Sequence, residues 1–311
     1  MTPSELLSLL FAPRDVGDGA DTRAFLKAWG PPSQAGEDGP SFFARLVRVA
    51  QKADRRAMAN AAGHQAAIRR LFPQTPPDAV VAFCVSEEHG PRPSKIVSSL
   101  QPAGEGYVLN GLKKWGSMSP VADLLYIAAS IGQVDGRNQL RMVAVPTDRA
   151  GLLIDEAPYA DYREDILIAD IALRNVAIAA SEIINADAYE AYIKPFRLIE
   201  DVYNTVGTQI GLLRLGLSHG WPQAVLEDLT ALILQAHALS ETSMSAPQDV
   251  IAMSAYFRAS GALWDALTPH WAGVPDPVKT LWRPDVGTLG VAARARETRR
   301  LKAWQAVRPD N

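Results

Sequence analysis

Residues 83–130 of this chain read FCVSEEHGPRPSKIVSSLQPAGEGYVLNGLKKWGSMSPVADLLYIAAS, and the expected fold follows from this stretch. Short runs rich in β-branched and aromatic residues alternate here with turn residues, such as Gly104-Glu105-Gly106 and Asn110-Gly111. The same pattern extends over residues 79–184, with a further turn at Asp135-Gly136. Closely spaced short strands of this kind are typical of a sandwich or small barrel. No strand leads into a G-x-G-x-x-G helix start, which argues against a Rossmann domain.

The segments on either side of this region have helical periodicity. Before it, two short helices are predicted at 4–10 and 21–29, followed by a long helical run that starts near Phe43 and stops at Pro73. After it, four amphipathic segments suggest a helix bundle. These segments cover residues 199–217, 225–239, 249–267 and 284–307. We therefore expect an α+β protein with three parts: an N-terminal helical domain (1–76), a middle β-barrel or sandwich domain (77–186) and a C-terminal four-helix bundle (187–311).

The composition excludes several classes of protein. Of 311 residues 48% are hydrophobic and the net charge is −3, so a sizeable core is expected and no overall field would recruit nucleic acid or an anionic membrane. A single cysteine, Cys84, rules out an internal disulfide and suits a reducing compartment. No run approaches the ~20 apolar residues of a membrane span, and no histidines lie at metal-ligand spacing. We expect a cytoplasmic protein without a metal site.

The quoted stretch resembles the middle domain of the acyl-CoA dehydrogenase flavoproteins. That family has an aromatic-x-x-Thr/Ser-Glu strand, a Gly-Tyr-x-Leu-Asn-Gly-x-Lys hairpin, a Trp-x-Thr/Ser motif and a strand introduced by Ala-Asp. The residues that match are Phe83, Ser86, Glu87, residues 106–113, Trp115, Ser117, Ala122 and Asp123. The helical, β, helical order of the chain is similar to that of the family as well.

The resemblance implies FAD as a cofactor. A flavin ring is a flat electron acceptor that needs an aromatic-lined slot and a few hydrogen bonds to its polar edge. In the family the Trp packs on the ring, and the hydroxyl two residues later bonds its N5/O4 edge. Transferred to this chain, the residues that would line the flavin are Phe83, Val85, Ser86, Trp115 and Ser117. The alternative is that Trp115 and Phe83 are ordinary core aromatics.

Two departures from the family concern the phosphates of FAD. The family's Gly-Ala-Gly-Ser-Asp loop, which approaches phosphates, corresponds to residues 89–94, where Pro91 and Pro93 lack N–H donors. Arg92 and Ser94 are the substrate or phosphate contacts that this loop would offer; the alternative is a surface turn. The family's Arg-x-x-Phe-Gly segment, which reaches the FAD of a neighbouring subunit, corresponds to residues 218–222, which contain no arginine.

A third departure concerns the catalytic base. Dehydrogenation of an acyl thioester needs a carboxylate that takes the α-proton. Most family members place it near the start of the last helix, but residues 288–294 contain none. Other members supply it from the first bundle helix, where matching the family glycines to Gly207 and Gly211 gives Asp201, with Glu200 beside it. The alternative is that these are solvated or capping carboxylates. Family chains are usually longer, so helices covering the acyl pocket are expected to be missing.

Three functions remain open at the level of sequence. The first is FAD-dependent α,β-dehydrogenation of an acyl-CoA, with Asp201 or Glu200 as the base. The second is a flavin-dependent monooxygenase of the same fold, which needs no such base. The third is a catalytically degenerate scaffold or binding subunit that does not hold FAD. The resemblance further implies a homodimer or homotetramer.

Overall fold

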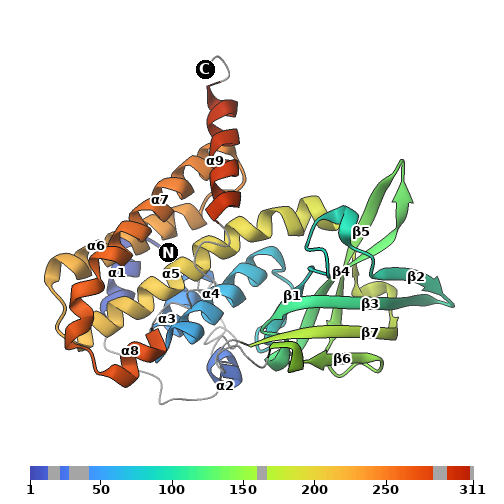
Figure 1. The fold of residues 1–311 in the computed structure, drawn as a ribbon, viewed down its shortest axis with the longest axis horizontal. Coiled ribbons are helices and arrows are strands. Elements are labelled where there is room, and N and C mark those ends of the chain that lie inside the picture. Colours follow the sequence, from blue (N-terminus) through green and yellow to red (C-terminus); the bar gives the residue numbers. More distant parts are fainter. Residues whose placement is uncertain (13–21, 28–41, 160–166, 283–292, 309–311) are drawn as a thin grey trace. The chain divides into compact units, whose positions relative to one another are not determined.

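A computed structural model describes residues 1–12, 22–27, 42–159, 167–282 and 293–308 (Figure 1). The chain divides into two compact units. The first unit comprises Met1–Ala20, Pro31–Ala67 and Leu198–Asn311, and the second comprises Asp21–Gly30 and Ile68–Arg197. Most of the helical residues that precede and follow the β region therefore fold into one unit, whereas Asp21–Gly30 groups with the β region.

The helical, β, helical order and the α+β class predicted from the sequence are confirmed. The α-helices are α1 (Pro3–Phe11), α2 (Thr22–Lys27), α3 (Phe42–Ala50), α4 (Arg56–Leu71), α5 (Lys194–Ser218), α6 (Gln223–Ser240), α7 (Pro247–Ala266), α8 (Asp276–Trp282) and α9 (Ala293–Val307). The strands are β1 (Val81–Cys84), β2 (Ser99–Ala103), β3 (Gly106–Ser117), β4 (Leu124–Val134), β5 (Arg137–Pro146), β6 (Leu152–Asp155), β7 (Ile168–Ile178) and β8 (Ile183–Ile184). Within these described ranges, every helix is too short or too polar to cross a membrane.

The strands of the second unit form a mixed 8-stranded sheet in the order β6-β7-β3-β2-β4-β5-β8, with β1 paired to β4. The β4–β5 hairpin turns at Asp135-Gly136, where both residues have positive φ (49° and 72°). This geometry matches a type I′ turn, which Asp-Gly favours. Strand β2 escaped prediction because it contains Pro102, which weakens a strand signal.

One face of this sheet closes over an apolar core. Its fully buried members come from most of the strands and include Ala82, Cys84, Leu109, Leu125, Ile127, Val143, Val145, Ile171 and Val176. Burial raises the pKa of the Cys84 thiol to about 12, so this cysteine behaves as a small hydrophobic residue.

In the first unit, the helical run predicted from Phe43 onwards is two helices, because α3 ends at Ala50 and α4 begins at Arg56. The amide of Gln51, just after α3, donates to the backbone oxygens of Leu9 (3.0 Å) and Leu10 (2.9 Å) at the end of α1. These carbonyls lie in the last turn of α1 and have no partner within their own helix. The side chain of Gln51, at the break between α3 and α4, supplies their hydrogen bonds.

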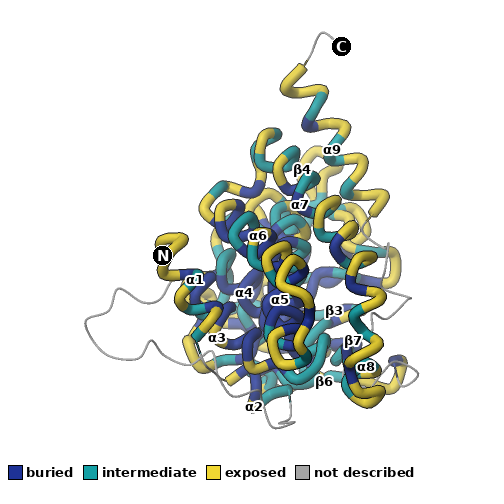
Figure 2. Tube along the Cα trace, turned by 90° about the vertical axis from the view of Figure 1, so that its left-hand side faces the viewer, coloured by how far each residue is buried: buried dark blue, intermediate teal, exposed yellow. Residues whose placement is uncertain are grey.

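Helices α4 and α5 of the first unit approach each other closely, and they lie side by side in Figure 1. A Cβ on Gly63 would lie 2.4 Å from the Tyr203 carbonyl oxygen, and one on Gly207 would lie 2.5 Å from that of Ala59. Only glycine fits at either position. The middle of α5 is buried, whereas α9 is largely exposed (Figure 2).

Candidate functional site

The ends of strands β1 and β3 bring together three of the predicted flavin contacts. The Lys114 N–H of β3 donates to the Ser86 carbonyl just beyond β1, at 2.8 Å. This bond places Ser86 against the part of β3 that carries Trp115 and Ser117. Val85 is buried beside Ser86 at 6% exposure. Ser86 and Lys114, which are 28 positions apart in the sequence, thus meet because β1 and β3 both belong to the same sheet.

Trp115 has two unusual properties. Its side chain is 52% exposed, although indoles are usually mostly buried. Its backbone has φ of 61°, in the left-handed region that bulky residues avoid. It lies where the register between β3 and β7 shifts, between Lys113 and Gly116, and this β-bulge re-aims the side chain. Strained backbone of this kind is found preferentially at functional sites.

Phe83 takes part in an aromatic cluster of the second unit. Its ring centroid lies 4.2 Å from that of Phe196 and 6.0 Å from that of Phe72. Phe72 in turn stacks on Tyr126 at 3.9 Å. Because Ala82 belongs to the apolar core of the sheet, Phe83 points to the other face. The packing alone accounts for an aromatic at this position, so its predicted flavin contact remains a prediction.

A buried ion pair fixes the geometry of this region. The Lys113 ammonium lies 2.6 Å from Glu87 Oε1, and both side chains are almost fully buried. Glu87 also accepts hydrogen bonds from the N–H groups of Val97 (2.8 Å) and Ser98 (3.1 Å). Burial would raise the pKa of Glu87, but Lys113 and these donors lower it below its usual value. The pair therefore joins β1, β3 and the intervening loop.

Both residues of this pair stand in the family-like motifs, but the motifs by themselves predict no contact between them. The signal was Lys113, a charged residue that alternation along β3 places on the same face as the core residue Leu109. A charge at such a position almost always has a partner.

Backbone N–H groups of the loop between β1 and β2 form hydrogen bonds within the loop itself. Five of them donate within the loop, either to a local carbonyl or to Glu87: those of Gly90, Lys95, Ile96, Val97 and Ser98. Pro91 and Pro93 have none to offer. Arg92 and Ser94 are both exposed. An anion that bound at this loop would consequently contact exposed side chains such as Arg92 and Ser94 more than backbone N–H groups.

The two candidate bases lie near the start of α5, in the first unit, and neither is solvated. Glu200 Oε1 is 2.9 Å from Nδ1 of His64, and the Asp201 carboxylate is 3.7 Å from the Arg296 guanidinium. Their side chains are only 15% and 11% exposed. Most of the other segment considered for a base, residues 288–292, lies outside the described residues.

The segment 218–222, where the resemblance leads one to expect an arginine, carries a buried indole instead. Trp221 is 5% exposed, and its ring meets that of Trp271 edge-on with centroids 5.5 Å apart. The backbone N–H of Trp221 donates to the Gly216 carbonyl near the end of α5, at 2.9 Å. This segment therefore closes the α5–α6 connection by packing.

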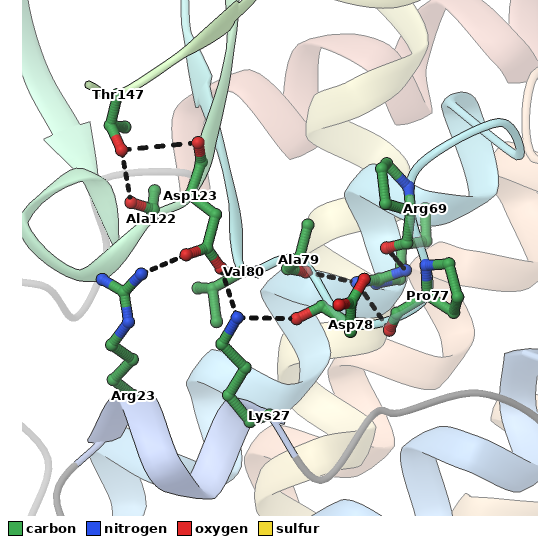
Figure 3. Close-up of polar contacts among 11 residues, drawn as sticks. Arg23, Lys27, Arg69, Pro77, Asp78, Ala79, Val80, Ala122, Asp123 and Thr147 are labelled. Carbon is green, nitrogen blue, oxygen red and sulfur yellow. Dashed lines mark hydrogen bonds and ion pairs between the residues drawn. The ribbon is translucent and has the colours of Figure 1, made fainter.

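A polar network in the second unit surrounds Asp123, the Asp of the Ala-Asp motif (Figure 3). Its carboxylate accepts from Arg23, from Lys27 (2.8 Å) and from the Val80 N–H (2.7 Å). Burial would raise the pKa of Asp123, but these donors lower it. Helix α2 is thus attached to the start of β4 through one carboxylate.

We predict that Asp123→Ala releases α2 from the sheet. Amide hydrogen exchange in residues 22–27 should accelerate at least tenfold, because both cations lose their carboxylate partner. The same release should occur in the unmodified protein as the pH falls below about 4, since a carboxylate with a lowered pKa loses its stabilising charge on acidification. Asp78→Ala is the matched control, because Lys27 contacts only the backbone oxygen of Asp78. Equal acceleration in the two variants would contradict the prediction.

No family model matches the chain. The probable acyl-CoA dehydrogenase FadE10 of Mycobacterium tuberculosis (strain ATCC 25618 / H37Rv) is 31% identical over 91 residues. The match covers 28% of this chain and only 14% of that relative.

Solved structures align over nearly the whole chain. An acyl-CoA dehydrogenase from Geobacillus kaustophilus gives a TM-score of 0.65 at 12% identity, covering 92% of this chain and 90% of that one. A glutaryl-CoA dehydrogenase from Mycobacterium smegmatis gives 0.58 at 16% identity, with 93% and 87% covered. The FAD complex of PigA gives 0.56 at 14% identity, with 92% and 85% covered. These likenesses establish the fold.

Proposed function

We propose that this chain, which has the acyl-CoA dehydrogenase fold, is a flavin-dependent oxidoreductase that holds FAD and desaturates an acyl thioester. The observation that carries the proposal is Trp115, an exposed indole held in a strained backbone conformation beside Ser86 and Ser117. An exposed indole held in a strained conformation is a surface on which a flat ligand could stack.

In this proposal each residue has a defined task. Trp115 offers its indole face to the isoalloxazine ring, and the hydroxyls of Ser117 and Ser86 bond the polar edge of the ring. Arg92 and Ser94 meet a phosphate group through their side chains. When bound, FAD supplies the acceptor for a hydride. Asp201 removes the α-proton of the substrate and must exchange its contact with Arg296 to do so.

The first test is the uptake of FAD by the purified protein. We predict that the wild type binds FAD, seen as a yellow colour and a titratable visible spectrum, and that Trp115→Ala weakens binding about 10- to 100-fold. A flat heterocycle stacked on an aromatic side chain is worth about 1–3 kcal/mol.

Leu153→Ala is the matched control, because Leu153 is 58% exposed on β6 of the same sheet. Its FAD affinity should equal that of the wild type. A protein that stays colourless with excess FAD would refute the proposal.

A second candidate function is a scaffold or binding subunit without dehydrogenase activity. Both candidate carboxylates contact basic side chains, and backbone N–H groups of the β1–β2 loop form hydrogen bonds within the loop.

If the chain binds FAD but no acyl-CoA bleaches it, the flavin-dependent monooxygenase becomes the better proposal, since that chemistry needs no carboxylate base. Oxidation of NAD(P)H by the FAD-bound protein under oxygen would distinguish a monooxygenase from the scaffold.

We also propose that the chain assembles into a homodimer or homotetramer, as the resemblance implies. Light scattering of the purified protein tests this assembly.

A further inference from the structure

The strained backbone at Trp115 needs something to hold it. A bulky residue with positive φ is energetically unfavourable and persists only where its surroundings enforce it. The β-bulge that contains Trp115 also interrupts the ladder between β3 and β7. Trp115 therefore has no paired residue in the β3–β7 register, and its backbone N–H donates to a side chain instead. That side chain is a candidate for what enforces the conformation.

That partner is Tyr159, at the end of the short helix Ala157–Tyr159. Its phenol oxygen accepts the Trp115 N–H at 3.0 Å. The two rings also touch, with centroids 4.9 Å apart and planes inclined by 58°. Tyr159 is itself only 8% exposed, so the tyrosine lies under the exposed indole and supports it.

A carboxylate on β7 fixes the tyrosine. The Tyr159 hydroxyl donates to Asp170 Oδ1 at 2.7 Å, and Lys114 donates to Asp170 Oδ2 at 2.7 Å. Asp170 is 5% exposed. Lys114 immediately precedes Trp115 on β3. The contacts of Trp115 with Tyr159, of Tyr159 with Asp170 and of Asp170 with Lys114 therefore form a closed ring around the bulge.

We propose that Tyr159, fixed by Asp170, is a positioning residue that holds Trp115 as the platform for the flavin ring. This inference rests on the proposed function, because it takes the flavin as the ligand of Trp115. Tyr159 itself lies behind the platform and acts through Trp115.

The test compares Tyr159→Phe with the wild type. The substitution keeps the ring contact but removes the hydrogen bonds of the hydroxyl with Trp115 and Asp170. FAD dissociation constants should rise about tenfold, because the free indole no longer starts in the binding conformation. At saturation, the bound flavin should be more fluorescent, since quenching by a stacked indole requires close contact. Amide exchange at Trp115 should accelerate at least tenfold even without flavin.

Tyr126→Phe is the matched control. It removes a buried tyrosine hydrogen bond of the same unit, 2.8 Å to Thr75, and neither partner is one of the described residues Trp115, Tyr159, Asp170 and Lys114 that surround the bulge. Asp170→Asn should retain most of the affinity, because its amide oxygen still accepts from Tyr159, whereas Asp170→Ala should behave like Tyr159→Phe.

The outcomes separate the two proposals. Wild-type affinity in Tyr159→Phe, or an equal loss in Tyr126→Phe, would overturn the positioning role while leaving FAD binding intact. If the wild type takes up no flavin, the proposed function fails and the flavin platform fails with it. Amide exchange at Trp115 then decides whether Tyr159 holds the bulge, and unchanged exchange in Tyr159→Phe would overturn that as well.

Discussion

Lys113→Met lowers the free energy of unfolding of the second unit by about 3–5 kcal/mol, because it leaves the buried Glu87 carboxylate without its counter-charge. Methionine fills a similar volume, so the loss is electrostatic rather than a cavity. Since typical domains are stable by only about 5–15 kcal/mol, the variant should be near the limit of folding. Urea unfolding, followed by amide exchange in β1 and β3, measures the effect.

Acidification provides an independent readout of the same variant. In the wild type the lowered pKa of Glu87 means that its contribution is present above about pH 4.5 and is lost as the pH falls through the folded-state pKa. Without Lys113, a buried carboxylate takes up a proton more readily. The difference between wild type and variant should therefore shrink at low pH.

The matched control is the double variant Glu87→Gln/Lys113→Met. Its neutral glutamine leaves no unpaired charge, and its single amide oxygen still accepts the N–H group of Val97 or of Ser98, so much of the lost stability should return. A loss under about 1 kcal/mol in Lys113→Met, or a double variant no more stable than the single one, would show that the pair does not fix this region.

Asp201→Asn, in protein that binds FAD and is bleached by an acyl-CoA, slows flavin reduction about 10²- to 10⁴-fold, the usual contribution of a general base. Asparagine keeps the size of the side chain and its contact with Arg296 through the amide oxygen, so acyl-CoA affinity should change little. Rapid-mixing measurement of flavin bleaching separates these two quantities.

Glu200→Gln is the control for the neighbouring carboxylate. It alters the contact with His64 but leaves Asp201 in place. Undiminished bleaching in Asp201→Asn would exclude Asp201 as the base. If Glu200→Gln is then the slow variant, the base is Glu200, and His64 is the side chain that orients it.

Most of the fold could be predicted from local patterns. The alternation of short strands with Gly-containing turns and the helical periodicity on both sides depend on neighbouring residues, and these gave the α+β class. What escaped prediction depended on distant contacts. The break between α3 and α4 satisfies carbonyls of α1 through Gln51, and β2 forms around Pro102 because β3 pairs with it.

The candidate site shows the same division. Motif spacing singled out Phe83, Val85, Ser86, Trp115 and Ser117, and the fold brings Ser86 against the segment that holds Trp115 and Ser117. Their flavin contacts remain predictions. The ring of contacts through Tyr159 and Asp170 could not be predicted, because those residues lie in a different segment and have ordinary identities.

By itself, the sequence determined that a strand-rich segment lies between two helical ones, because residue periodicity and turn chemistry act over a few neighbouring positions. It also placed an aromatic and two hydroxyls at family-like spacing. Only the tertiary structure decided that Trp115 is exposed on a strained bulge, that Glu87 and Lys113 form a buried pair, and that Glu200 and Asp201 face basic partners. Burial and pairing depend on which distant segments meet, and no local pattern encodes that.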